Sequence, residues 1–360
     1  MNHYPSNVKE KLNSIILSMA EHHWLFSKNP GHDFTRQHLG KLSFYDTMRL
    51  IISMGKGSTN DEIMDYFDLN PDLIPSQSAF CQRRRQISLS AFEYLFSEFS
   101  SSFPSTTDKF KDHCILACDG CHIVYATNSD IIEDYNKPRL IDYKGYNHMH
   151  LNGFVDVISK AFLDVVIQPG QQPDEREALH SMLDHFTPDD PQKYIITADR
   201  GYESYDLLFH CELKNLGYVF RVKSPSSPKS ILSYYASEFP DDLEEFDVTI
   251  KRFFTDKATN IMKSQSDVYR YINPSKNTPH FYELLRKKHS HLYFLQFRVV
   301  KIKTAENTYE YLITNLPFSF TLDDIRECYH WRWGIEISFR YLKHAAGLLY
   351  FHSKQPECLK

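Results

Sequence analysis

The stretch YHWRWGIEISFRYLK, residues 329–343, determines how the rest of the chain can be interpreted. A helix advances about 100° and about 1.5 Å per residue, so four polar side chains of this stretch fall in one stripe roughly 60° wide and about 21 Å long. These side chains are Tyr329, Arg332, Glu336 and Lys343. An apolar stripe beside them is predicted to pack on the core, and it consists of Cys328, Trp331, Ile335, Phe339, Leu342 and Ala346. Thr321 with Asp324 predicts the start of the helical region, and Gly347 predicts its end.

By itself, the polar stripe is compatible with an ordinary solvated helix face. Two earlier aspartates favour a functional role, because each follows an apolar run typical of a buried strand. CILACDG, residues 114–120, predicts a strand with Asp119 at its carboxyl end, and KYIITADRGYES, residues 193–204, repeats the pattern with Asp199. A strand-end aspartate can also be only a turn residue or a helix cap. Together with Glu336, however, the two aspartates are predicted to meet at one edge of a sheet.

Three carboxylates within a few ångströms repel one another and are not expected to ionise together without a cation. Carboxylate oxygens suit Mg²⁺, with Mn²⁺ as a substitute. Two such ions about 3.5–4 Å apart can activate a nucleophile and stabilise the leaving oxygen of a phosphodiester. We therefore predict that Asp119, Asp199 and Glu336 bind two Mg²⁺ ions and are the catalytic residues. Arg332 offers a planar fork that matches a phosphate, and Lys343 offers a mobile point charge.

The spacing of the four polar residues in 329–343 resembles the Tyr-Arg-Glu-Lys signature of DDE transposases of the insertion-sequence-four family. The block Asp199–Tyr202 is similar to the sequence around the second aspartate of that family, which implies a supporting role for Arg200. The resemblance covers residues 110–345 in motif order. It implies that Tyr329, Arg332 and Lys343 contact phosphates near the cleaved end of the element.

The resemblance implies a DNA transposase that cleaves strands at the ends of an insertion sequence with Mg²⁺ and then joins the freed 3′-OH to target DNA. Its partner would be double-stranded DNA, at the terminal inverted repeats and at the target, bound by a dimer on paired ends. Family members usually continue well past the signature, whereas this chain stops at Lys360, seventeen residues after Lys343, so a C-terminal truncation is expected. Two alternatives stay open. One is a truncated, catalytically silent DNA-binding remnant or inhibitor of transposition, and the other is a metal-dependent nuclease without strand transfer.

The order of the predicted elements is typical of an α/β protein with a ribonuclease-H-like core. The strand at 114–120 is followed by a hairpin, a helix, a second strand with its acid, a helix and a third strand, at 151–169, 174–186, 193–204, 205–216 and 217–223. Residues 121–147 are predicted to be an irregular connection. Polar, proline-containing breaks at 101–110 and 224–230 suggest boundaries. We predict a helical DNA-binding region at 1–105, the first part of the core at 106–223, a β-rich insertion at 224–317 and a core helix with the catalytic glutamate at 318–360.

Two basic clusters indicate where DNA could bind. A short helix after Ser58 or Thr59, a turn, and SAFCQRRRQI at 78–87 resemble a helix-turn-helix, in which Arg83, Arg84 and Arg85 would contact phosphates. The alternative is a small helical bundle with an exposed basic face. Between residues 284 and 305 there is no acidic residue, and the basic ones are Arg286, Lys287, Lys288, Arg298, Lys301 and Lys303. This pattern predicts a basic side on the insertion that also binds DNA.

The composition narrows the class of protein. No apolar run reaches about 18 residues, so neither a transmembrane helix nor a membrane partner is expected. The net charge of −5 does not by itself indicate a nucleic-acid binder, although local patches can bind DNA. Seven cysteines, an odd number without framework spacing, predict a reducing, cytoplasmic location, and the resemblance to transposases implies that the protein is associated with DNA there.

Two further ligand patterns compete with the carboxylate site. Cys118 and Cys121 form a CxxC pattern, but no second CxxC accompanies them, so neither a redox pair nor a zinc site is expected. His148 and His150 alternate, as do His289 and His291. Alternating histidines on a strand can bind a metal, but isolated pairs of this kind are more often surface residues.

Overall fold

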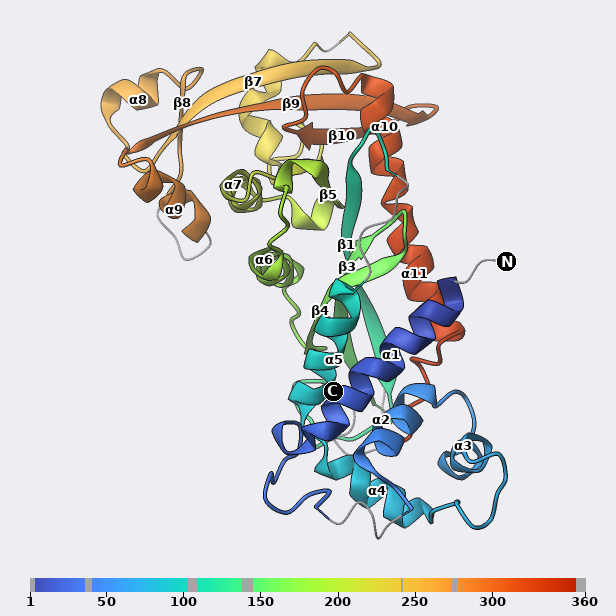
Figure 1. Cartoon of the computed structure of the whole chain (residues 1–360). Helices are drawn as coiled ribbons and strands as arrows, with labels where there is room; N and C mark the ends of the chain where they lie inside the picture. The colour runs from blue at the N-terminus through green and yellow to red at the C-terminus, as the bar shows by residue number, and fades with distance from the viewer. Residues whose placement is uncertain are drawn as a thin grey trace.

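The computed structural model describes residues 4–35, 41–102, 109–137, 145–240, 242–273 and 278–353. Within these ranges a helical bundle lies beside a large mixed sheet, and helices cover both faces of the sheet (Figure 1). The predicted boundary between residues 105 and 106 lies outside the described residues, and so does 138–144 of the predicted connection. No helix in the described ranges is both long and apolar enough to cross a membrane.

The amino-terminal region is helical, as predicted. Its elements are α1 (Tyr4–Glu21), the short 3-10 helix η1 (His23–Leu25), α2 (Phe44–Ser53), α3 (Thr59–Tyr66), α4 (Gln77–Gln86) and α5 (Leu89–Ser101). Ser43 and Ser58 begin α2 and α3 with capping boxes, in which each serine and an aspartate three residues later accept each other's backbone N–H. Two apolar clusters hold the helices together, one containing Met48 between α1, α2 and α5, and one containing Phe80 between α2, α3 and α4.

The sheet has the strand order of a ribonuclease-H-like core. Its strands are β1 (Cys114–Tyr125), β2 (Tyr135–Asn136), β3 (Tyr146–Asp156), β4 (Ala161–Pro169), β5 (Tyr194–Ala198), β6 (Gly217–Val222), β7 (Phe246–Thr255), β8 (Tyr269–Tyr271), β9 (Leu292–Ala305) and β10 (Thr308–Thr314). β3 lies antiparallel between β4 and β1, while β5 and β6 continue on the other side of β1 in parallel. The predicted hairpin of β3 and β4 and the predicted fold class are therefore confirmed.

The first strand is longer than the sequence predicts. The apolar run predicts an end at Asp119, whereas β1 continues to Tyr125 because β3 pairs with it along this whole length. Pairing with β5, in contrast, stops at Ala117. Asp119 therefore lies inside β1, just beyond the part that β5 covers. Residues 121–125, 135–136 and 146–147 are strand, so the prediction of an irregular connection over 121–147 is wrong at these positions.

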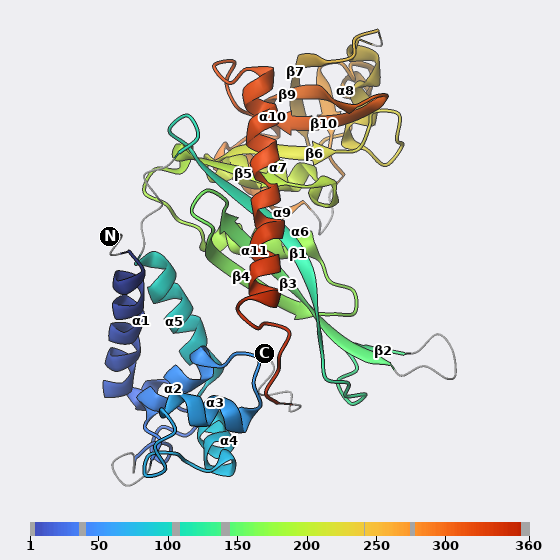
Figure 2. The same ribbon diagram turned by 90° about the vertical axis from the view of Figure 1, so that its right-hand side faces the viewer.

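Helices pack on both faces of the sheet. One face carries α6 (Glu175–His185), α7 (Tyr205–Leu213) and α9 (Pro279–Lys287), whose buried side chains share one apolar cluster. The other face carries α10 (Leu322–Trp331) and α11 (Trp333–His344), which follow one another almost in line across the sheet (Figure 2). The predicted capping box of Thr321 and Asp324 begins α10. The short elements are η3 (Pro191–Lys193), η4 (Arg200–Tyr202), η5 (Ile231–Glu238) and α8 (Asn260–Ser264).

The strands after residue 224 extend the core sheet. β10 pairs antiparallel with β6, and β9, β7 and β8 follow outward, so the predicted hairpin of β9 and β10 is confirmed. The prediction of a basic surface that binds DNA is wrong for Arg298, because this side chain is buried and paired with Asp247. A buried guanidinium needs a partner of opposite charge, and this one cannot face DNA. Lys303 also pairs with an acid, Glu244, at 2.6 Å.

Candidate active site

Two helices replace the single helix predicted for 329–343. At their junction the N–H of Arg332 bonds to the carbonyl of Tyr329, and the N–H of Ile335 bonds to the carbonyl of Arg332, each at 3.1 Å. Hydrogen bonds of this three-residue spacing turn the chain by about 120° per residue instead of about 100°. The side chains of α10 therefore point in directions that differ from those expected if residues 329–343 formed one uninterrupted helix.

The apolar stripe is only partly buried for this reason. Cys328, Ile335 and Phe339 are buried as predicted, and Leu342 is half-buried. The prediction is wrong for Trp331, which is 40% exposed and precedes the tight turn. It is also wrong for Ala346, which is exposed because α11 has already ended.

Asp119 and Asp199 occupy equivalent positions on neighbouring parallel strands. The last register pair of β1 and β5 is Ala117 with Thr197, and each aspartate follows two residues later. Side chains two residues apart on a strand share a face, and adjacent strands are about 4.8 Å apart. The two carboxylates therefore start from matching points on one face of the sheet. The Asp199 carboxylate accepts the N–H of Gly201 at 2.7 Å, which fixes it at the start of η4.

Arg332 connects Asp119 to Glu336. Its Nη1 donates to Oδ2 of Asp119 at 3.2 Å, and its Nη2 donates to Oε1 of Glu336 at 3.1 Å. The Arg332 side chain is only 7% exposed, compared with 21% for Asp119 and 37% for Glu336. Two acids that are far apart in the sequence thus meet on the two arms of one guanidinium.

A fourth carboxylate, that of Glu175, lies beside the two aspartates. A Cβ atom placed on Gly120, which follows Asp119, would lie 2.8 Å from Oε1 of Glu175. A Cβ atom on Gly201 would lie 3.4 Å from the other oxygen of Glu175 and 2.9 Å from Oδ1 of Asp199. The sequence gives no distinctive signal for this residue, because an acid in the first turn of a helix is ordinary.

The pKa of Asp119 reflects this crowding of acids. Burial raises the pKa of the carboxyl group to about 6. This net value includes smaller opposing contributions, because the Gly120 N–H and the Arg332 guanidinium lower the pKa, while the negative charges of Asp199 and Glu175 raise it. The oxygen donors and the excess of negative charge fit a hard divalent cation such as Mg²⁺.

Asp119→Asn should stabilise the metal-free protein above about pH 6. The folded-state pKa is raised above the usual value of 3.8, so the ionised carboxylate destabilises the fold at high pH, and this penalty disappears as the pH falls toward 3.8. Urea unfolding should show a gain of about 1–3 kcal/mol near ~pH 7.5 and a much smaller gain near ~pH 4.5. The exposed Asp72→Asn is the control and should show no such difference. A variant that is less stable at both pH values would mean that the pairing with Arg332 outweighs burial.

Tyr329 lies under the Arg332 side chain. The guanidinium carbon of Arg332 is 5.6 Å from the centre of the Tyr329 ring, a cation–π contact. The Tyr329 side chain is buried, and its hydroxyl has no hydrogen-bond partner among the described residues. Burial raises the pKa of this phenol, so it stays a protonated donor.

Lys343 and Arg200 lie on two other sides of the acids. Lys343 is beside Cys121, whose thiol pKa is raised by burial and lowered by the lysine charge. Cys121 is two residues beyond Asp119 on β1, so Lys343 lies farther along the same strand. Arg200 is exposed in η4, directly after Asp199. The structure therefore brings the predicted signature residues to one region of the sheet.

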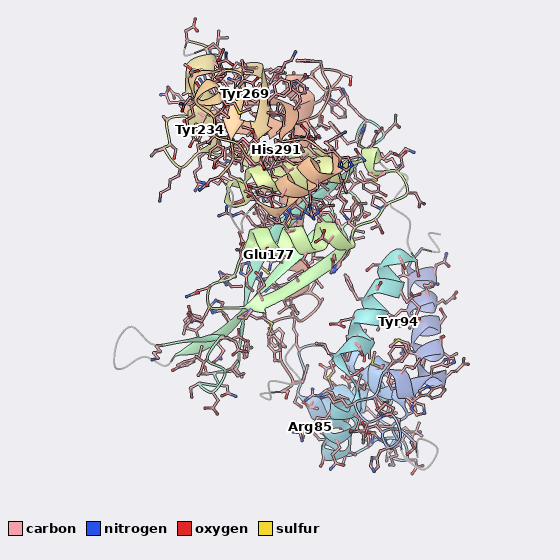
Figure 3. All side chains as sticks on the ribbon, turned by 90° about the vertical axis from the view of Figure 1, so that its left-hand side faces the viewer. Arg85, Tyr94, Glu177, Tyr234, Tyr269 and His291 are labelled. Carbon is pink, nitrogen blue, oxygen red and sulfur yellow. The ribbon has the colours of Figure 1, made fainter. Side chains whose placement is uncertain are left out.

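The three arginines of α4 do not form one basic face. The guanidinium of Arg83 packs over the ring of Phe34 at 5.1 Å, and that of Arg84 donates to the carbonyl of His352 at 3.3 Å. Both side chains are half-buried, whereas Arg85 is exposed at the end of the bundle remote from β7–β10 (Figure 3). α4 is thus separated from the acids on β1 and β5.

The competing ligand patterns have different outcomes, because the two cysteines are separated whereas two of the histidines lie together. Cys118 and Cys121 are three residues apart on β1 and point to opposite faces, and the cysteines of the described ranges are free. The sequence favours surface positions for His148 and His150, but both are buried because they face His122 across the β1–β3 pair. His291 is exposed and pairs with Asp256 at 2.9 Å.

Comparisons with known proteins identify the family. The model of the transposase DDE domain matches residues 110–357, which include Asp119, Asp199 and Glu336. Among solved structures, a piggyBac transposase in a synaptic complex with hairpin DNA is similar with a TM-score of 0.43 and 10% identity, over 84% of this chain and 60% of that chain. The chain thus spans less than two thirds of the length of that transposase. No curated protein matches the sequence. Because the domain model covers most of the chain, the protein belongs to the transposase DDE domain family.

Proposed function

We propose that the protein is a transposase of the insertion-sequence-four type, which cuts DNA at the ends of an insertion sequence and joins the freed ends to target DNA. One observation carries the proposal: Asp119 and Glu336 share one arginine fork, and Asp199 starts from the matching position on the next strand. The spacing of Tyr329–Lys343 supports the narrower assignment within the family.

Asp119, Asp199 and Glu336 would hold two Mg²⁺ ions, or Mn²⁺ in their place. The donor set fits, because it consists of carboxylates and because the pKa of Asp119 is raised by burial and by its acidic neighbours. When bound, such ions activate the attacking oxygen and stabilise the leaving oxygen of an in-line phosphodiester displacement. Glu175 lies close enough to contribute a further oxygen.

The remaining residues would hold the DNA. Arg332 fixes the positions of Asp119 and Glu336 and is the nearest cation for a phosphate at the cleaved end. The buried hydroxyl of Tyr329, which has no partner in the part of the chain that the structure describes, and the mobile charge of Lys343 would be two further contacts. The DNA would be double-stranded, and two chains would act on paired ends.

Arg85→Ala should weaken binding to all DNA sequences alike, because a phosphate contact carries no sequence information. The log–log slope of affinity against salt should become shallower by about 0.9 for one lost contact. Arg83→Ala should change the slope less, since Arg83 packs on Phe34. Lys193→Ala serves as the control, because it removes an exposed basic side chain from the core. An unchanged slope for Arg85→Ala in gel-shift titrations would exclude α4 from the DNA contact.

The proposal is tested with DNA that carries the inverted repeats flanking the gene. With Mg²⁺, the protein should nick the DNA at the ends of the repeats and join the new 3′-OH ends to a target plasmid. Nicks without joining would identify a nuclease instead. Binding without nicks would identify a catalytically silent DNA-binding protein.

A further inference from the structure

Three histidines from three helices meet on the face of the sheet opposite α10 and α11. His180 of α6, His210 of α7 and His280 of α9 each have a ring nitrogen within 4.8 Å of one on the other two. Their rings are stacked, with centroids 3.8 to 5.2 Å apart and interplanar angles of 11 to 17°. The three helices lie side by side in Figure 1.

A carboxylate faces the outer nitrogen of each ring. Nδ1 of His280 is 2.7 Å from Oδ2 of Asp206, and Nε2 of His180 is 3.6 Å from the same oxygen. Nε2 of His210 is 3.2 Å from Oδ1 of Asp184. Carboxylates in this position fix the tautomer of a histidine and leave its other nitrogen free as a ligand.

The inner nitrogens of His180 and His210 face each other at hydrogen-bond distance. Nδ1 of His180 and Nδ1 of His210 are 2.9 Å apart. If both outer nitrogens are protonated toward Asp206 and Asp184, both inner nitrogens present lone pairs. A neutral ring that donated its N–H inward would no longer donate to its carboxylate, and a doubly protonated ring would place its charge inside the cluster. A shared cation satisfies both nitrogens at once.

The charge of Asp206 favours a cation as well. Its side chain is 1% exposed, and Oδ1 accepts the N–H groups of His280 and Phe281 at 3.1 and 3.2 Å, which fixes the carboxylate at the start of α9. A carboxylate buried this deeply is stabilised by a cation nearby, and an ion held between the three imidazoles would supply that positive charge.

We propose that His180, His210 and His280 bind one Zn²⁺ ion, with Asp206 and Asp184 orienting the rings. Zinc accepts imidazole nitrogens in their ring planes at about 2.0–2.1 Å in a tetrahedral arrangement, so the stacked rings would turn out of their parallel planes when the ion binds. The fourth position is open to water, since the side chains of His180 and His280 are each 13% exposed. Mg²⁺ prefers oxygen ligands, so the carboxylate site and the histidine site select different ions.

The ion would link α9, which belongs to the segment after residue 224, to α6 and α7 of the core. α6 and α7 belong to the core between residues 174 and 216, whereas α9 lies between β8 and β9. Without the ion, α9 is held by the contacts of Phe281, Leu284 and Leu285 and by Asp206 at its start. Zinc should therefore raise the unfolding temperature and protect α9 from amide hydrogen exchange.

The full chain, freed of metal with a chelator, is titrated with Zn²⁺ and separately with Co²⁺. We expect one equivalent of either ion to bind, and Co²⁺ to produce the visible absorption of a four-coordinate site. His180→Gln and His280→Gln should each abolish this absorption and weaken zinc affinity by more than about 100-fold. Circular dichroism of each variant shows that it is folded.

Three matched variants show whether the bound zinc lies at the three histidines. His185→Gln, on the same helix but outside the cluster, should bind zinc like the wild type. Asp119→Asn should also bind it unchanged, which excludes the carboxylate site. Asp184→Asn keeps an oxygen acceptor but removes the negative charge that faces Nε2 of His210, and it should weaken zinc affinity by about 10- to 100-fold. The proposal is overturned if folded His180→Gln and His280→Gln retain wild-type zinc affinity, or if the wild type gives no four-coordinate Co²⁺ absorption.

Discussion

Glu336→Gln should lower Mg²⁺-dependent nicking by about a thousand-fold or more while leaving DNA affinity within a few-fold of the wild type. The substitution keeps the shape of the side chain and its contact with Arg332 but removes the charge that would hold a cation. Stabilisation through a metal ion is worth several kcal/mol, and about 1.4 kcal/mol corresponds to a factor of ten in rate. Nicking of the repeat-end DNA and gel-shift affinity are measured on the same preparation.

The matched control for this variant is Glu327→Gln. Glu327 lies on α10, ahead of the junction at Arg332, and is exposed. The control variant loses the same charge on the same pair of helices but should nick DNA at the wild-type rate. Normal cleavage by Glu336→Gln would show that α11 is only structural and that the proposed site is wrong.

Arg332→Ala should reduce nicking by about ten- to a hundred-fold. This is the rate change expected from the loss of one charge-assisted hydrogen bond, which contributes roughly 1.5–3 kcal/mol. The variant removes the fork that holds Asp119 and Glu336 together and the nearest cation for a phosphate. It also removes a positive charge that competes with Mg²⁺ for these carboxylates. The Mg²⁺ concentration at half-maximal thermal stabilisation should therefore stay constant or fall.

Arg332→Lys distinguishes charge from geometry in the same assay. A lysine carries the charge but cannot donate from two fixed nitrogens to two carboxylates, so it should restore little of the lost nicking. Full recovery in Arg332→Lys would mean that only the charge matters. A higher Mg²⁺ requirement in Arg332→Ala would mean that the arginine prepares the carboxylates for the metal rather than competing with it.

The elements and acids that the sequence predicts well depend on local signals. Apolar runs of strand length identify β5, β6 and the β3–β4 hairpin, and the Thr321–Asp324 pattern identifies the start of α10. The position of Asp199 follows directly from the end of its strand. Alternation and capping are properties of neighbouring residues, so a single sequence contains them.

Features that depend on contacts between distant segments could not be predicted. β1 continues past Asp119 only because β3 pairs with it, and Gly120 to His122 have no unbroken apolar pattern. Glu175 reaches the acids through the placement of α6 on the sheet. His180, His210 and His280 are 30 and 70 residues apart and have no spacing that indicates a common site. The turn at Arg332 contains Gly334, but a single glycine inside an amphipathic helical pattern does not by itself predict a break in the helix.

The pairing of β10 with β6 has a consequence for the chain as it leaves the ribosome. Val222 of β6 pairs with Tyr311 of β10, which is about 90 residues later in the chain. The edge of β6 therefore stays unpaired until most of the intervening segment has been translated. The helix with Glu336 is made later still. A nascent chain therefore exposes an open strand edge that invites mispairing, and it lacks the third acid throughout that interval. If the three acids form the catalytic set that we propose, the chain acquires the ability to cut DNA only after the helix with Glu336 has been synthesised.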